Sequence, residues 1–227
     1  MKEVQAPANY GLNPTVFTAD IEFAGQVVKL NVTDPVITAG VSIKKTGYAQ
    51  TMNNNIMRWT VSGVRNDSTT SLQSFYWRDT LPTDAVRLTR LVTGTYSTTQ
   101  TYKVTFTTNL NSQWRTAYDN LSTAKNYTLD MSSAALGLAS NEYVTQFMLS
   151  FGIVPAGFHQ LTNATVDAQT LYALTNGYKF TNKADVGGLL GGNWVQSIAR
   201  WTTSIYSHYV PAKPAAPKSP TLPRTGY

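Results

Sequence analysis

The sequence predicts an all-β protein, most simply a β-sandwich, and three observations carry this prediction. Charged residues make up only 13% of the 227 residues, while aromatic residues make up 11% and threonine occurs 33 times. Threonine and aromatic side chains suit the pleated, half-buried surface of a sheet. Apolar and polar residues alternate along short segments that turn residues separate, and no stretch has a clear helical period. Short strands at such regular spacing are typical of a sandwich.

Two scarce residue types exclude several kinds of site. The chain has no cysteine, which excludes a disulfide framework, a thiolate metal site and a cysteine nucleophile. Its two histidines, His159 and His208, are too few for a histidine-rich metal site. We therefore expect neither a metal nor a cofactor.

The net charge of +6 does not indicate a nucleic-acid partner. Lys213, Lys218 and Arg224 lie after residue 210 with no acidic residue among them, and they account for half of that charge. The rest of the chain has no basic cluster that could follow a phosphate backbone. No apolar run approaches the roughly 18 residues of a membrane-spanning helix, and no signal peptide is recognisable at the start.

The first predicted element is a β-hairpin within residues 17–33. Apolar and polar residues alternate over 17–23 and again over 28–33, and Ala24-Gly25-Gln26 between them has the composition of a tight turn. Two strands alone are only marginally stable. The hairpin is therefore expected to pack on the next domain or to end a domain whose earlier part lies upstream.

The main body of the chain follows the break at Asp34-Pro35. Alternation predicts strands around residues 41–45, 57–61, 75–79, 102–106 and 178–186. The largely apolar composition of residues 143–154 predicts a buried strand, and a further strand is expected over 194–206. Gly187-Gly188 is expected to end the strand before it, with 187–192 forming a flexible loop. Residues Ser132–Ser140 are rich in alanine and leucine and predict one or two helical turns.

The C-terminal segment changes character. Five prolines recur at every third position, namely Pro211, Pro214, Pro217, Pro220 and Pro223. Polyproline II has three residues per turn, so these prolines fall on one face of a semi-rigid spacer. The predicted organisation is thus 1–33 as the end of one domain, 34–209 as a sandwich domain, and 210–227 as a proline-rich tail.

The spacer ends in a short motif made of Leu222, Pro223, Arg224, Thr225 and Gly226. It resembles the LPXTG sorting signal of Gram-positive surface proteins and pilins. The resemblance implies sortase and the cell wall as partners and an extracellular, wall-anchored location. The hydrophobic helix and basic tail that follow the motif in that family are missing after Tyr227, which leads us to expect a fragment of a longer protein.

A second resemblance involves the first 33 residues. Glu3, Ala6, Pro7 and Tyr10 match the E-x-x-A-P-x-x-Y pattern in the last strands of SpaA-type or Cna-B-type pilin domains. In that family the glutamate catalyses a bond between a lysine and an asparagine. The lysine-bearing first strand is absent here, so Glu3 is expected to be an ordinary strand residue.

A third resemblance covers residues 34–206. The motifs are Lys44-Lys45-Thr46-Gly47, the run from Trp77 to Pro82, and the run from Phe180 to Val186. They are similar to the Cna-A-like repeat domains of Gram-positive adhesins and pilins. The resemblance implies an immunoglobulin-like sandwich with an isopeptide bond, in which Lys45 is the nucleophile, Asn182 the electrophile and Asp79 the proton shuttle.

The strand phases of these three residues agree with an internal site. Lys45, Asp79 and Asn182 each share a strand face with large apolar residues, because side chains alternate between the two faces. A buried, unpaired lysine or aspartate is costly, and a meeting of the three groups resolves that cost. Burial would lower the pKa of the lysine and raise that of the aspartate.

Three alternatives stay open for this trio. The residues could form a covalent bond, form a hydrogen-bonded group without a bond, or lie apart on the surface. A strand slip of one residue would also turn Lys44 inward in place of Lys45.

The expected function is a structural stalk or shaft domain of a wall-anchored surface protein, with neighbouring domains as partners and no enzymatic turnover. The alternative is an adhesin module that binds a host protein or a glycan, for which Tyr76 and Trp114 are candidate stacking residues. A stalk predicts chain ends at opposite poles and no concave aromatic site. An adhesin predicts a groove or a cluster of exposed tryptophan and tyrosine side chains.

Overall fold

The computed structural model describes residues 56–206 without a break, residues 32–48, 50 and 51, and a subset of the positions before residue 30. The strands are β1 Val41–Gly47, β2 Gln50–Thr51, β3 Ile56–Asn66, β4 Leu72–Thr80, β5 Val86–Val92, β6 Thr95–Tyr96, β7 Thr101–Thr108, β8 Arg115–Ser122, β9 Thr128–Asp130, β10 Val144–Val154, β11 Gln160–Thr162, β12 Ala164–Thr170, β13 Lys179–Leu190 and β14 Asn193–Tyr206. None of these described residues is helical, so the all-β prediction is confirmed.

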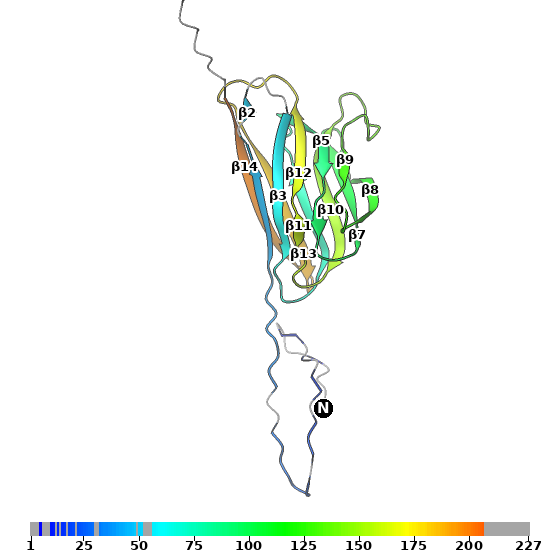
Figure 1. Ribbon diagram of the computed structural model, residues 1–227, viewed down its shortest axis with the longest axis vertical. Helices are drawn as coiled ribbons and strands as arrows, with labels where there is room; N and C mark the ends of the chain where they lie inside the picture. The colour runs from blue at the N-terminus through cyan, green and yellow to red at the C-terminus, as the bar shows by residue number, and fades with distance from the viewer. Residues whose placement is uncertain are drawn as a thin grey trace, which may run out of the picture.

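Two sheets stack face to face to form the sandwich (Figure 1). One has five strands in the order β1-β3-β12-β5-β9, and the other has seven in the order β2-β14-β13-β4-β10-β7-β8. The pairings within both sheets are antiparallel except for the short parallel contact of β2 with β14. Two small strands, β6 and β11, pair separately.

The core lies between the sheets and is rich in aromatic side chains. Trp59, Phe75, Trp77, Phe147 and Phe158 are all almost completely buried. Trp77 packs edge-on against Phe147, and its indole Nε1 donates a 2.8 Å hydrogen bond to the Tyr96 hydroxyl. Alternating inward positions of β3 and β4 supply much of this core, as the period of two predicted.

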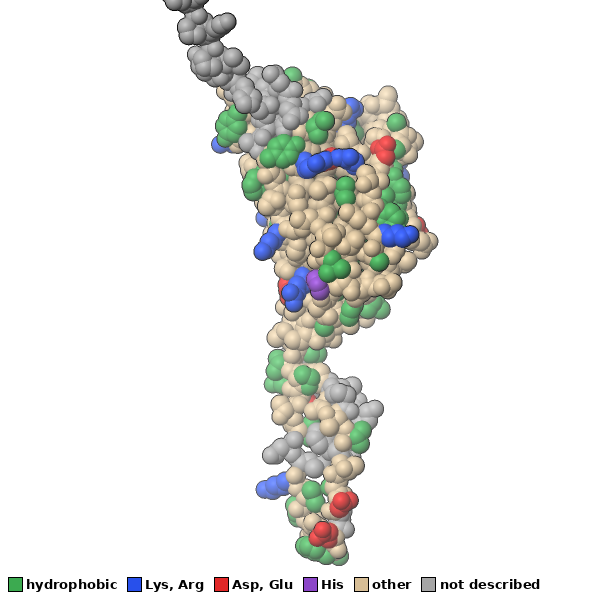
Figure 2. All heavy atoms as spheres, viewed as in Figure 1, with side chains coloured by type: hydrophobic (Ala, Val, Ile, Leu, Met, Phe, Trp, Pro, Cys, Tyr) green, Lys and Arg blue, Asp and Glu red, His purple; other side chains and the backbone are tan. Residues whose placement is uncertain are grey.

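The outer face of the five-stranded sheet is mostly uncharged (Figure 2). Its central charged group is Asp167 on β12, which accepts hydrogen bonds from Arg58 on β3 and Arg90 on β5 at 2.6–2.8 Å. This arrangement ties three adjacent strands together across the surface.

The glycine run at residues 187–192 corrects one prediction. β13 continues through Gly187 and Gly188 to Leu190, and the turn falls at Gly191-Gly192, where φ is 56° and 85°. Two consecutive positive φ values suit a tight two-residue hairpin turn. Gly187 and Gly188 lie within the strand. Glycine is favoured at both positions because a Cβ at residue 187 would lie 3.1 Å from the Tyr76 ring, and a Cβ at residue 188 would lie 3.0 Å from Leu72 Cβ. Close packing against β4, and not chain flexibility, explains these glycines.

The Ala- and Leu-rich segment forms turns without a helix. Leu136 N donates to Ser132 O at 3.1 Å, as in one helical turn, but the chain turns away before a helix forms. Gly137 with φ 63° ends this turn.

The N-terminal hairpin is confirmed only at its turn. Gln26 N donates to Phe23 O at 3.3 Å around Ala24-Gly25, but the described residues on either side of this turn form no strand before β1. Figures 1 and 2 show the segment projecting from the sandwich with apolar side chains along it. Val27 is 82% exposed. A two-stranded ribbon without a third strand buries too little to be stable, which accounts for the missing strands.

Several predictions concern residues outside the described part of the chain. These are Glu3, residues 207–227 with the proline spacer, and the motif Leu222–Gly226. The division into 1–33, 34–209 and 210–227 therefore stays a prediction.

The chain enters and leaves the sandwich at opposite poles. β14 ends at Tyr206, where it pairs with β2, and β2 comes shortly after the C-terminal end of β1. Tyr206 and the C-terminal end of β1 therefore lie at one pole, and Val41, at the start of β1, lies at the other (Figure 1). This path matches what a stalk domain requires.

Gly47 is expected to be essential for stable packing of β1. A Cβ at this position would lie 2.7 Å from the Trp201 and Trp59 rings, which are held in the sandwich. Gly47→Ala should lower the free energy of unfolding by about 1–3 kcal/mol in urea denaturation, the usual cost of overpacking. Gly40→Ala is the control, since its nearest neighbour would be at 3.4 Å. Equal stabilities for the two variants would contradict the prediction.

Candidate functional site

Lys45 points into the sandwich from β1. Its side chain is fully buried, whereas the adjacent Lys44 is exposed. Ile43 lies on the same inward face, and the Lys45 Nζ is 5.9 Å from the centroid of the Trp59 ring. The register therefore directs Lys45, and not Lys44, to the interior.

Asp79 meets this lysine from the opposite sheet. It lies on β4 between β10 and β13, its side chain is fully buried, and one carboxylate oxygen, Oδ2, pairs with the Lys45 Nζ. The other oxygen, Oδ1, has no hydrogen-bond partner. The pair thus joins the two sheets through the core.

Asn182 completes the cluster from β13. Asp79 is directly opposite Ala184 in the β4–β13 ladder, so Asn182, two residues along, is its diagonal neighbour on the same face. Asn182 is fully buried, and neither its amide oxygen nor its amide nitrogen has a hydrogen-bond partner. A buried amide without partners costs free energy, and native proteins rarely retain one.

Burial sets the electrostatics of the trio. Desolvation lowers the pKa of Lys45, and the Asp79 carboxylate opposes that fall. Desolvation raises the pKa of Asp79, against the effects of Lys45 and of the nearby Asn182 amide. Asn182 is thus close enough to influence Asp79, although no hydrogen bond of ordinary geometry joins them. Both directions favour a neutral amine beside a neutral acid.

The strands that carry the trio decide what a bond between them would connect. β1 belongs to the five-stranded sheet and packs against β13 and β14 of the other sheet. A bond from Lys45 to Asn182 would therefore tie the sheets together. It would join the first strand to the penultimate one, not to the last.

The outer face of the seven-stranded sheet contains a hollow of about 620 Å³. Tyr76 and Trp114, the candidate stacking residues, both line it, and Trp194 at the start of β14 joins them. The expectation that a stalk domain has no concave aromatic site is therefore wrong. Sequence reasoning missed Trp194, although it lies in the same outward phase as Gln196 and Ile198.

The described residues contain no group of three or more histidine, aspartate and glutamate side chains placed to hold a metal ion. Nor do they include a helix long and apolar enough to span a membrane.

Comparison with known proteins gives remote structural likenesses. No family model and no curated protein sequence matches the chain. The collagen-binding subdomain of the Enterococcus faecalis surface protein ACE is 12% identical, with 72% of this chain and 95% of that chain covered and a TM-score of 0.32. The major pilin subunit BcpA of Bacillus cereus is 12% identical, with 91% and 54% covered and a TM-score of 0.38.

A C-terminal fragment of a major pilin of Streptococcus agalactiae is 10% identical, with 74% of this chain and 56% of that chain covered and a TM-score of 0.35. The chain thus spans little more than half of either pilin structure. The all-β architecture described above follows from the strand pairing of this chain itself.

Proposed function

We propose that this chain is a structural module of a surface-displayed bacterial protein, stiffened by an amide bond between Lys45 and Asn182. The observation that carries the proposal is the fully buried Lys45–Asp79 pair beside an asparagine whose amide atoms have no partners. The module performs no turnover; its chemistry is a single self-linking event.

The linking step is a transamidation. The neutral amine of Lys45 attacks the side-chain carbonyl carbon, Cγ, of Asn182, while the protonated Asp79 donates a hydrogen bond to the carbonyl oxygen. The new bond joins Nζ to Cγ, and the bond from Cγ to Nδ2 breaks. Asp79 relays a proton from the lysine nitrogen to the leaving nitrogen, which departs as ammonia. The acid is regenerated, and neither an oxidant nor another reactant is needed.

The local energetics support this step. Without the bond, the core contains a lysine, an aspartate with one unpartnered oxygen and an asparagine with an unpartnered amide. Each group pays for its removal from water without full compensation. The amide bond replaces the buried amine and the unpartnered asparagine amide with one secondary amide, whose N–H and C=O can bond to the Asp79 carboxyl.

Display on a cell surface is supported by the sequence features at the C-terminus. The Leu222–Gly226 motif resembles a sortase signal, and the prolines before it suit a spacer through a cell wall. The route of the chain from one pole of the sandwich to the other supports a position within a shaft. The partners proposed from these features are sortase, the cell wall and neighbouring domains of the same protein.

Intact-mass spectrometry tests the link directly. The unaltered protein should weigh less than its sequence by one ammonia, and both Lys45→Ala and Asn182→Ala should have their full sequence masses. Lys44→Ala is the matched control, because this exposed neighbour should leave the ammonia loss unchanged. A full sequence mass for the unaltered protein would overturn the proposal. An ammonia loss that persists in Lys45→Ala would assign the link to other residues.

A further inference from the structure

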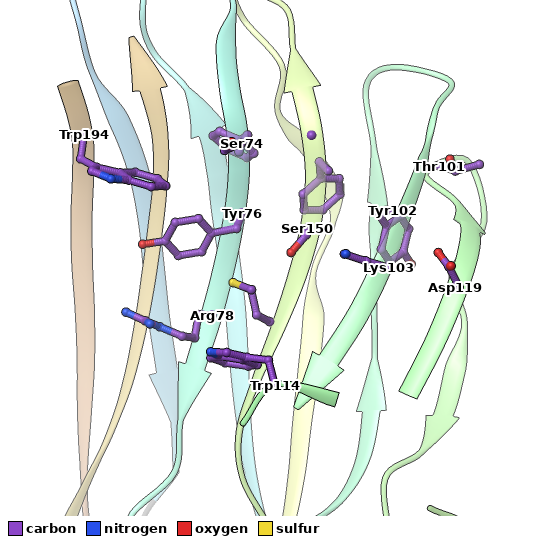
Figure 3. A pocket seen from close by; sticks show the side chains of 14 residues that line it. Ser74, Tyr76, Arg78, Thr101, Tyr102, Lys103, Trp114, Asp119, Ser150 and Trp194 are labelled. Atoms are coloured by element: carbon purple, nitrogen blue, oxygen red, sulfur yellow. The ribbon is translucent and has the colours of Figure 1, made fainter. Parts of the chain in front are cut away.

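The hollow on the outer face of the seven-stranded sheet is the strongest feature that the proposed link does not use. Figure 3 shows Trp194, Tyr76, Arg78 and Trp114 on one side of it, Lys103 and Asp119 on the other, and Ser150 between them. The buried Tyr102 and Phe151 also line it. Five strands or their ends contribute, namely β4, β7, β8, β10 and β14.

The aromatic side of this groove offers open ring surface. Trp114 and Trp194 are 40% and 54% exposed, so part of each indole ring is open to a ligand. Tyr76 packs edge-on against Trp194, with ring centroids 5.9 Å apart. Its hydroxyl accepts a 3.1 Å hydrogen bond from Gln196, which holds the ring in place. Tyr76 and Trp194 therefore form a packed aromatic pair at this side of the groove.

Backbone irregularities shape the groove. Ser74 and Asn120, with φ of 51° and 54°, are the two non-glycine residues of the described chain with positive φ. Ser74 lines the groove, and Asn120 follows Asp119, which also lines it. Each lies at a β-bulge, because β4 has one residue more than β13 between Gln73 and Tyr76, and β8 one more than β7 near Asn120. Bulges re-aim side chains, and positive φ at such residues is costly, so both are frequent at binding sites.

The charges of the groove indicate a neutral ligand. The Arg78 guanidinium is held by two hydrogen bonds to Asp185, at 3.1 and 3.0 Å, so its charge is already balanced. Lys103 and Asp119 are both exposed and carry opposite charges. With Asp185 counted, the lining has no net charge. It still offers hydroxyl, ammonium and carboxylate groups as hydrogen-bond donors and acceptors.

We propose that this groove binds a neutral, β-linked oligosaccharide of glucose-type or N-acetylglucosamine-type pyranoses. Sugars of this type have equatorial hydroxyl groups, so their C–H faces are flat and can stack on the Trp114 and Trp194 rings. Their edge hydroxyls can bond to Lys103, Asp119 and Ser150. An anionic polymer would need net positive charge, which the groove does not have. The sugar site does not depend on the Lys45–Asn182 link.

Titration with cellopentaose and chitopentaose, followed by the indole N–H signals in NMR spectra, tests the proposal. The Trp114 and Trp194 signals should shift and saturate with at least one of the two sugars, while those of the buried Trp59 and Trp77 should not. The variant with both Trp114→Ala and Trp194→Ala should bind about tenfold more weakly or worse, a loss of at least about 1.4 kcal/mol. Tyr206→Ala is the matched control, since this tyrosine is exposed outside the groove.

One more variant and two competing ligand classes serve as controls for the sugar titration. Lys103→Ala, a change at an exposed position, should also weaken binding and guards against misfolding of the double variant. A heparin-derived hexasaccharide and a polyproline peptide serve as competing ligand classes. Binding of only the heparin fragment or only the peptide would overturn the proposal, as would the absence of any saturable shift. The intact masses of the groove variants should equal that of the parent protein apart from the substitutions, which separates this test from that of the link.

Discussion

Asp79→Ala is expected to leave the chain unlinked and to lower its free energy of unfolding by about 8–10 kcal/mol. Loss of a link that closes a loop of 137 residues, from Lys45 to Asn182, costs about 5 kcal/mol by analogy with disulfides. An unpaired lysine left in the core costs about 3–5 kcal/mol more. Since a domain typically has only about 5–15 kcal/mol of stability, the variant should be marginal. Guanidinium denaturation and intact mass measure the two effects separately.

Two further variants make the result decisive if Asp79→Ala fails to fold. Asp79→Asn keeps the shape of the side chain but cannot relay a proton, so it should have the full sequence mass while it remains folded. The double variant Lys45→Met with Asp79→Leu replaces the pair with apolar groups, and it should recover much of the stability that the single change removes. An ammonia loss that persists in Asp79→Asn would show that Asp79 takes no part in the link.

A single unaltered molecule pulled between positions 41 and 206 is expected to lengthen far less than Lys45→Ala. The link would shield the segment from Lys45 to Asn182, which spans 137 residue steps, from tension. At about 3.5 Å per extended residue, the hidden length is roughly 480 Å. The contour-length gain in force spectroscopy should therefore increase by about that amount in the variant.

Matched variants define the force measurement. Asn182→Ala should give the same additional length as Lys45→Ala, because each removes one end of the link. Gly40→Ala should behave as the unaltered chain, since it lies outside the trio and has room for a Cβ. Equal lengths for linked and unlinked chains would mean that no bond bears tension in this domain.

Much of the sandwich could be predicted because strand alternation is a local property. The inward phase of Lys45 follows from Val41 and Ile43, and that of Asp79 from Phe75 and Trp77. The predicted strand at 143–154, which rests on its apolar composition, and the predicted final strand at 194–206 correspond closely to β10 and β14.

Other elements could not be predicted because they depend on distant neighbours. Gly187 and Gly188 have the composition of a turn, but Tyr76 and Leu72 on the adjacent strand require glycine there within a strand. The alternation over residues 17–33 is that of a hairpin, but no third strand in the described chain completes it.

The groove shows most clearly the difference between features that follow from local sequence and features that depend on distant neighbours. Tyr76 and Trp114 could be named as exposed aromatic candidates, but nothing local placed Trp194 beside them, 80 residues after Trp114. The bulges at Ser74 and Asn120 exist only in relation to the strands that pair with them.

By itself, then, the sequence determined the strand period, the inward face of each strand and the residue types able to form a trio. The tertiary structure decided which of them meet, because a period of two specifies a direction within one strand, whereas contact between sheets depends on register, bulges and packing across the whole chain.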